Sequence, residues 1–186
     1  GNRWGYGPAL AQLFKLTTLE HGMSTSDISN LFIDYLDSPM GILQLEANAA
    51  GLRAISFVEE RPTTSKPSQI TDSTRQQLRE YFAGDRRVFD LPISVNGTVF
   101  QQQVWQQLTL IPYGQTCSYQ DIATGLDNPK AVRAVGSANG KNPLTIVVPC
   151  HRVIGANGKL TGYAWGVSRK EYLLKHEMNL AKSPLC

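Results

Sequence analysis

A cysteine and a histidine stand side by side at Cys150 and His151, directly after Pro149 and the β-branched run at residues 146–148. A thiolate, rather than a thiol, is the nucleophile in cysteine chemistry, so a reactive cysteine needs a base or a nearby cation. His151 is the obvious base, and Glu177 is our candidate for the carboxylate that would orient its ring. Adjacent side chains usually point apart, so we expect a bridging water or a sharp local turn between thiol and imidazole. A buried structural cysteine is the alternative interpretation of the pair.

The elements that would position this pair can be read from local patterns. The β-branched run ending at Pro149 indicates a buried strand that holds the Cys150 sulfur at its edge. On the far side, Ser168 and Glu171 indicate the start of a helix that carries Glu177.

Two short helices are expected upstream of the pair. Ser118 with Asp121 resembles a capping box, and Asn128 as N-cap before Pro129 indicates a second helix that Gly140 closes. Two short helices joined by a turn are a helix-turn-helix candidate. Spacing alone favours an ordinary helical hairpin.

The rest of the chain predicts an α+β fold in two domains. An Asn96-Gly97 turn separates residues 23–96 from residues 97–186, and we read residues 1–22 as a tag or an N-terminal arm outside the fold. In the first domain a small antiparallel sheet precedes a helix, and the second is mostly helical. The strands are expected at 31–36, 41–47 and 52–58, and the long helices at 68–82 and 98–110.

Composition excludes several classes of protein. The 186 residues are 41% hydrophobic and 18% charged, which excludes a disordered chain, and no apolar run is long enough to span a membrane. Three scattered cysteines fit neither a disulfide scaffold nor a zinc site, so we expect a reducing compartment and a cytoplasmic protein. The net charge of +3 hides an asymmetry. Residues 1–96 carry 9 basic and 11 acidic side chains, whereas residues 97–186 carry 9 basic and 4 acidic.

The run Pro149-Cys150-His151-Arg152-Val153 closely resembles the active-site signature of the O6-alkylguanine-DNA alkyltransferases, also called methylated-DNA–protein-cysteine methyltransferases. The resemblance spans roughly residues 31–177 and is greatest to the bacterial constitutive type. Each further match is short, but the order and spacing together are specific. These matches are Ser118-Tyr119-Gln120, residues 128–136, Asn142-Pro143, Thr161-Gly162-Tyr163 and residues 170–177.

The resemblance implies a fold and a reaction. The fold would join a small ribonuclease H-like antiparallel-sheet domain to a helical domain with a helix-turn-helix. The protein would flip O6-methylguanine, with O4-methylthymine as a second substrate, out of double-stranded DNA through the minor groove. It would transfer the alkyl group irreversibly to Cys150, as a monomer and without a cofactor.

The resemblance also implies roles for individual residues. Arg133 matches the arginine that fills the gap left by the flipped guanine, and Tyr119 matches the tyrosine that drives nucleotide rotation and addresses the purine. Asn142 matches a hinge between recognition helix and active site. The small residues expected to face DNA are Ala131, Ala134, Gly136 and Ser137. The base pocket is expected to be lined by Val153, Tyr163, Ala164 and Trp165.

Other interpretations stay open at this level. A zinc site like that of some relatives is not expected, because no cysteine precedes Cys117, so we predict no metal. A Cys-His hydrolase would explain the pair but would need an oxyanion hole and would turn over. A non-catalytic sensor of alkyl lesions would share the fold, although such proteins lack the cysteine.

Trp165 generates the first testable prediction. Some relatives have glycine at this position, and an indole there should narrow the pocket against bulky O6 substituents. We therefore expect O6-benzylguanine to react more slowly with this protein than the O6-methyl substituent does, measured as the rate of Cys150 alkylation. Equal rates for the two substituents would contradict the assignment of Trp165 to the pocket wall.

Overall fold

The computed structural model describes residues 30–181, and the chain divides between Asn96 and Gly97 into two compact units. The expected tag or arm at residues 1–22 and the terminal Cys186 lie outside the described residues. Strands dominate the first unit and helices the second, so the α+β class is confirmed. Within the described range, no helix is both long enough and apolar enough to cross a bilayer.

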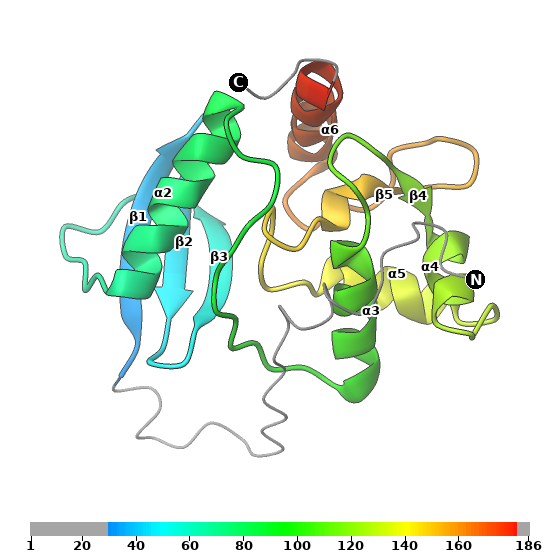
Figure 1. The fold of residues 1–186 in the computed structure, drawn as a ribbon, viewed down its shortest axis with the longest axis horizontal. Helices are drawn as coiled ribbons and strands as arrows, with labels where there is room; N and C mark the ends of the chain where they lie inside the picture. Colours follow the sequence, from blue (N-terminus) through cyan, green and yellow to red (C-terminus); the bar gives the residue numbers. More distant parts are fainter. Residues whose placement is uncertain (1–29, 182–186) are drawn as a thin grey trace. The chain divides into compact units, whose positions relative to one another are not determined.

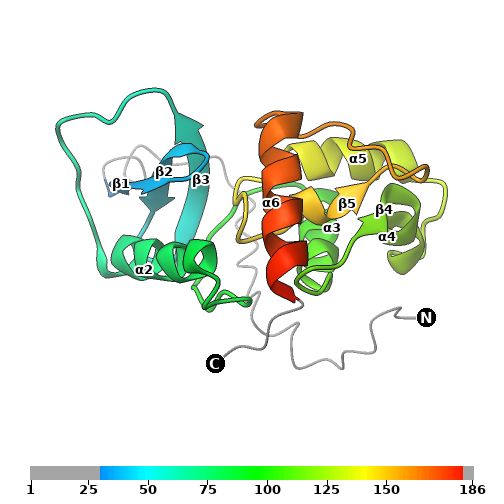
Figure 2. The same ribbon diagram turned by 90° about the horizontal axis from the view of Figure 1, so that it is seen from above.

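The N-terminal unit is a three-stranded antiparallel sheet covered by one helix. The strands β1 (Phe32–Ser38), β2 (Gly41–Ala47) and β3 (Leu52–Val58) are hydrogen-bonded in that order, as the sequence predicts. Alternate residues of β2 are buried, and α2 (Gln69–Ala83) lies along this face of the sheet (Figures 1 and 2). The core of this unit therefore lies between one sheet face and one helix.

Local signals fix the ends of α2. Ser68 is the N-cap in a reciprocal capping box with Thr71, and Gly84, at φ +87°, ends the helix in the left-handed conformation that glycine adopts easily. Leu78 and Tyr81 point from the helix into the core and are fully buried.

The C-terminal unit packs its helices against one another, beside two short parallel strands. The elements in chain order are α3 (Val99–Thr109), β4 (Cys117–Ser118), α4 (Tyr119–Gly125), α5 (Val132–Gly140), the 3₁₀ turn η2 (Cys150–Arg152), β5 (Val153–Ile154) and α6 (Val167–Ala181). The helix α3 is anchored to α5 by the Trp105 indole, whose Nε1 donates to the Ala138 carbonyl at 2.9 Å. The strands pair through Cys117 and Val153, and η2 and β5 lie beside α6 (Figure 2).

The pair α4 and α5 forms as expected, but α5 begins later than predicted. The capping box of Ser118 and Asp121 is confirmed. The start at Asn128 is wrong, because Asp127 has φ +56° and the Ala131 N–H closes a separate turn onto the Asn128 carbonyl. Ala131 is the N-cap of α5 and has no side-chain hydrogen bond to offer. The predicted cap thus lies in the turn between the helices.

The last helix begins two residues before the start that a cap at Ser168 predicts. Because α6 starts at Val167, after Gly166 at φ +95°, Ser168 lies inside the first turn rather than at the cap. The position of Glu177 on this helix is unaffected.

Gly51 provides a test of how tightly the N-terminal unit is packed. A Cβ at this position would lie 2.8 Å from backbone atoms of Pro92 and Ile93, which cannot move without disturbing the hydrogen bonds to Leu52. We expect Gly51→Ala to lower the free energy of unfolding by about 1–3 kcal/mol, measured by urea denaturation.

Gly140→Ala is the control for this substitution. A Cβ on Gly140 would meet nothing within 4 Å, so the change should be neutral or stabilise the protein by less than about 1 kcal/mol. Equal stability of the two variants would contradict the close approach at Gly51.

Candidate active site

The segment before Cys150 is a strained turn rather than the predicted strand. The Val148 N–H donates to the Leu144 carbonyl at 2.8 Å, and Ile146 has φ +74°. A β-branched residue rarely adopts this left-handed conformation, so the surrounding contacts must fix it. The prediction of a strand is wrong because the turn-forming hydrogen bonds outweigh the β preference of the run. The short strand in this region, β5, follows the Cys-His pair.

Cys150 and His151 lie in the single 3₁₀ turn η2. The Cys150 N–H donates to the Val148 carbonyl and the Arg152 N–H to the Pro149 carbonyl, at 2.8 and 3.0 Å. Cys150 is 5% exposed and His151 is 0% exposed. The sharp local turn expected between the adjacent side chains is therefore present, and both side chains are buried.

Glu177 on α6 connects the histidine to the next residue of η2. His151 Nε2 lies 2.7 Å from Glu177 Oε1, and Arg152 donates from Nε to Oε2 at 2.8 Å and from Nη2 to Oε1 at 2.9 Å. All three side chains are buried. The guanidinium also donates from Nη1 to the Ile111 carbonyl at 2.7 Å. A buried carboxylate is thus met by three directed donors.

These contacts determine the protonation of the pair. Burial alone would raise the pKa of Glu177, but the contacts with His151 and Arg152 outweigh it and hold this pKa below its usual range. Burial lowers the pKa of His151, and the carboxylate offsets only part of this shift. At neutral pH the carboxylate is therefore ionised and the imidazole neutral. Its proton lies on Nε2, toward Glu177, which leaves Nδ1 as a hydrogen-bond acceptor.

His151 Nδ1 is the atom of the ring that remains available for chemistry. It is buried, and within residues 30–181 it has no hydrogen-bond partner. A buried lone pair without a donor is uncommon in native structures and indicates a functional site. This nitrogen can accept a proton, because Glu177 on the opposite side of the ring stabilises the resulting imidazolium.

The Cys150 thiol has opposing influences on its ionisation. Burial raises its pKa, and the Asn142 amide, the Lys170 ammonium and the N–H groups of Cys150 and His151 offset only part of this rise. Lys170 itself is 0% exposed, and its Nζ donates to the Val153 carbonyl at 2.6 Å and to the Thr161 carbonyl at 3.1 Å. No carboxylate in the described part of the chain forms an ion pair with this ammonium.

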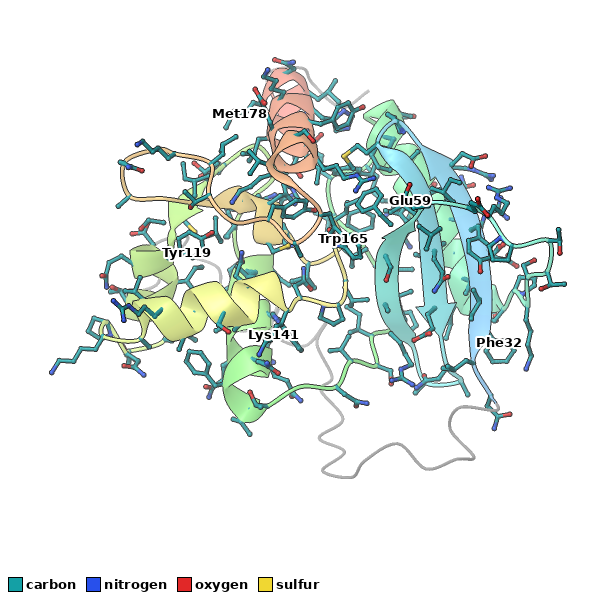
Figure 3. The ribbon with its side chains drawn as sticks, turned by 180° about the vertical axis from the view of Figure 1, so that it is seen from behind. Phe32, Glu59, Tyr119, Lys141, Trp165 and Met178 are labelled. Atoms are coloured by element: carbon teal, nitrogen blue, oxygen red, sulfur yellow. The ribbon has the colours of Figure 1, made fainter. Side chains whose placement is uncertain are left out.

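The loop that leads to α6 is hydrogen-bonded to residues elsewhere in the C-terminal unit. The Tyr119 hydroxyl donates to the Thr161 carbonyl at 3.2 Å, and the hydroxyls of Tyr163 and Thr145 are hydrogen-bonded at 2.5 Å. Of the residues expected to form a pocket wall, Val153 and Tyr163 are buried. Trp165 is half-buried and Ala164 exposed, in the loop that leads to α6 (Figure 3).

Three of the five expected DNA-facing residues form an exposed strip on α5, and the other two, Ala131 and Gly136, are half-buried beside it. Arg133, Ala134 and Ser137 are exposed at a spacing that gives a single helix face, and Ala131 precedes them as the N-cap. Gly136 faces the Tyr119 ring, since a Cβ there would lie 4.0 Å from it. Lys141 follows at the end of the helix, as Figure 3 shows. The strip is thus made of small side chains and one arginine.

Metal ligands do not gather in this part of the molecule. Across residues 30–181, no three His, Cys, Asp or Glu side chains are placed to hold a metal ion. Cys117 is buried in β4 beside Val153, as a small core residue.

Comparison with known families accounts for both units. Residues 31–95 match the ribonuclease-like domain of 6-O-methylguanine DNA methyltransferase, and residues 99–179 match its DNA binding domain. The chain belongs to this methyltransferase family. The family and fold expected from the sequence are therefore confirmed.

Individual family members match about four fifths of this chain over nearly the whole of their own length. The methylated-DNA–protein-cysteine methyltransferase of Methanosarcina acetivorans is 44% identical over 153 residues, which are 79% of this chain and 98% of that protein. The Mycobacterium tuberculosis O6-methylguanine methyltransferase structure has a TM-score of 0.75 at 42% identity and covers 83% of this chain and 97% of its own. The structure of Mycobacterium tuberculosis OGT in complex with DNA has a TM-score of 0.73 at 45% identity, with 80% and 94% covered.

Two residues of this methyltransferase site, Arg152 and Lys170, were not predicted from the sequence. Arg152 stands inside the signature run, but nothing in its spacing predicts that it shares Glu177 with His151. Lys170 could have been found, because it lies seven residues before Glu177 and one turn from Leu173 and Leu174, on the apolar stripe of a helix. A lysine on a buried stripe indicates a cation with a specific partner.

The neutral state of His151 predicts a pH dependence of stability. Its folded pKa is lowered from the ordinary value of 6.5, so below that pH the unfolded chain binds a proton that the folded chain does not. The contribution of the neutral imidazole to the free energy of unfolding is fully present above this pH and is lost as the pH falls below it. We expect the C-terminal unit to lose about 1 kcal/mol between pH 7.5 and 5.5, measured by urea unfolding with tryptophan fluorescence.

His151→Gln is the matched variant, because a glutamine amide can still donate to Glu177 but does not titrate. This variant should show a flatter profile over the same interval. A variant profile as steep as that of the wild type would mean that another group causes the loss.

Proposed function

We propose that this protein repairs alkylated DNA by transferring the alkyl group from guanine O6 to its own Cys150, once per molecule. The observation that carries the proposal is the buried Cys150-His151-Glu177 arrangement, in which a neutral imidazole keeps one nitrogen free as a base. Membership of the methyltransferase family and the relatives' names support the same reaction. A DNA complex of a 45% identical protein supports DNA as the partner.

The proton leaves the thiol through His151. A water between Cys150 Sγ and His151 Nδ1 carries the proton to the ring, and the ionised Glu177 stabilises the imidazolium. The thiolate formed in this way lies near the Lys170 ammonium and the N–H groups at the start of η2. These groups offset the cost of placing a negative charge in a buried site.

The thiolate then attacks the alkyl carbon in line with the O6–carbon bond. A sulfur–carbon bond forms, the O6–carbon bond breaks, and its electron pair remains on guanine. The Tyr119 hydroxyl stabilises the departing purine at its oxygen or N3. In the structure this hydroxyl donates to the Thr161 carbonyl. The product is a thioether, which water does not hydrolyse, so the protein is consumed by one reaction.

Burial of Cys150 requires the base to leave the helix stack. At 5% exposure, the sulfur cannot reach an O6 atom that lies within a duplex, and rotating the nucleotide out costs a few kcal/mol. Arg133 fills the gap in the stack, and Tyr119 opposes the neighbouring phosphate during rotation. The small residues of the α5 strip, Ala131, Ala134, Gly136 and Ser137, allow close approach to the minor groove.

The flipped base is held by β5 and by the loop between β5 and α6. Val153 and Ala164 address the base through backbone groups, while Tyr163 and Trp165 enclose it. Asn142 joins the recognition helix to the turn before Cys150, since its Nδ2 donates to the Val148 carbonyl at 2.8 Å. All these residues come from one unit of one chain, so a monomer contains the complete proposed site.

Intact-protein mass spectrometry after mixing with a duplex that contains one O6-methylguanine tests this function. We expect each molecule to gain one methyl group, located on the Cys150 peptide, and no further gain with excess DNA. The reason is that the thioether leaves no thiolate for a second reaction.

Cys150→Ser is the control and should acquire no methyl group, although it keeps the other two cysteines. A methyl group on Cys117 or Cys186 would contradict the assignment of the acceptor. Multiple turnovers of substrate would instead support the hydrolase reading of the Cys-His pair.

A further inference from the structure

The strained turn before Cys150 depends on contacts from outside itself. Ile146 is buried at φ +74°, and such a backbone persists only where the surroundings hold it. Asn142 supplies part of this support, because its Oδ1 accepts from the Leu144 N–H at 2.9 Å and its Nδ2 donates to the Val148 carbonyl.

A second amide supports the other side of Pro149. Asn139 Nδ2 lies 3.4 Å from the Cys150 carbonyl, which also accepts the Val153 N–H. The carbonyls of Val148 and Cys150 are therefore each bonded to one local backbone N–H and to one asparagine amide. The two amides come from the end of α5 and from the residues just after it, so the backbone of Cys150 is attached to α5 on both sides.

Packing alone does not explain an asparagine at residue 139. The side chain is 3% exposed inside a helix, where asparagine is a weaker helix former than leucine. Its Oδ1 is buried and has no hydrogen-bond partner within the described chain, so the fold carries the cost of a partly satisfied amide. What Asn139 does provide is one directed contact, to the carbonyl of the reactive cysteine.

The position of Asn139 on α5 gives this contact a consequence. The exposed strip with Arg133 and Ala134 lies on the outer face of the helix, whereas Asn139 and Val135 are buried on the inner face. DNA held by the outer face determines where the lesion lies, and the contact on the inner face determines where Cys150 lies. The contact from Asn139, at 3.4 Å, is longer than the 2.8 Å contact from Asn142, so it is the one with room to shorten in the complex.

We propose that Asn139 is a positioning residue that aligns the Cys150 backbone with DNA bound on α5, so that it accelerates transfer from duplex DNA specifically. The proposal rests on the function proposed above. A free base is not attached to α5 and can adjust to Cys150 inside the pocket. Loss of the Asn139 contact should therefore slow the reaction with DNA and spare the reaction with free O6-methylguanine.

The experiment compares wild type, Asn139→Ala and Asn139→Leu under single-turnover conditions. Leucine keeps the branching of asparagine without the amide, so it covers the case in which the alanine variant is too unstable. The readout is the methyl group on the Cys150 peptide, from an O6-methylguanine duplex at several concentrations and from the free base. We expect the saturating rate with duplex to fall about tenfold. The half-saturating duplex concentration and the free-base rate should change less than about twofold.

Gln102→Ala is the matched control. Gln102 is also a buried amide in the same unit, and its Nε2 donates to the Gly97 carbonyl at 2.9 Å, so its loss tests for general destabilisation. An equal fall on both substrates, a weaker duplex affinity alone, or unchanged rates would each overturn the proposal. If wild type itself transfers no methyl group from the duplex, the proposed function fails instead.

Discussion

The C-terminal unit depends on one buried carboxylate. Glu177 accepts hydrogen bonds from His151 and from two nitrogens of Arg152, with every partner removed from water. Charges buried in this way are costly unless all their hydrogen bonds are made, and removing one partner leaves an uncompensated charge worth about 3–5 kcal/mol. The same contacts fix the tautomer of His151 and attach η2 to α6. The stability of this unit and the proposed reactivity of Cys150 therefore depend on the same few atoms.

The site is built from two helices that approach the cysteine from different directions. From α6 come Glu177 and Lys170, seven residues apart on one buried stripe, and these supply the charges. From the end of α5 and the residues just after it come two asparagine amides, which hold the carbonyls of Cys150 and Val148. Between them lies a turn with an unfavourable backbone at Ile146. A short turn held on both sides can place a thiol more reproducibly than a free strand end, because neither side leaves the backbone room to relax.

Short-range patterns predicted much of this arrangement. The three strands, the capping box at Ser118 and the domain fold follow from spacing that acts within a few residues. The signature around Cys150 indicated the family. The turn at Ile146 could not be predicted, because contacts from Asn142 override the β preference of the run. The sharing of Glu177 between two partners also depends on a separation of 25 residues along the chain, which no local pattern encodes.

The basic side chains of the C-terminal unit fall into two groups, buried and exposed. A count of charges in the sequence does not separate these groups. Arg152 and Lys170 are buried, so neither can contact a phosphate. Arg152 is balanced inside the fold by Glu177, and Lys170 lies where it acts on the Cys150 thiol. Phosphate contacts by exposed cations account for most of the salt-dependent affinity for DNA. The total charge therefore overstates the number of cations that DNA can contact, because it includes the two buried cations beside Cys150 and His151. The exposed basic side chains before, on and after α5 are Lys130, Arg133 and Lys141.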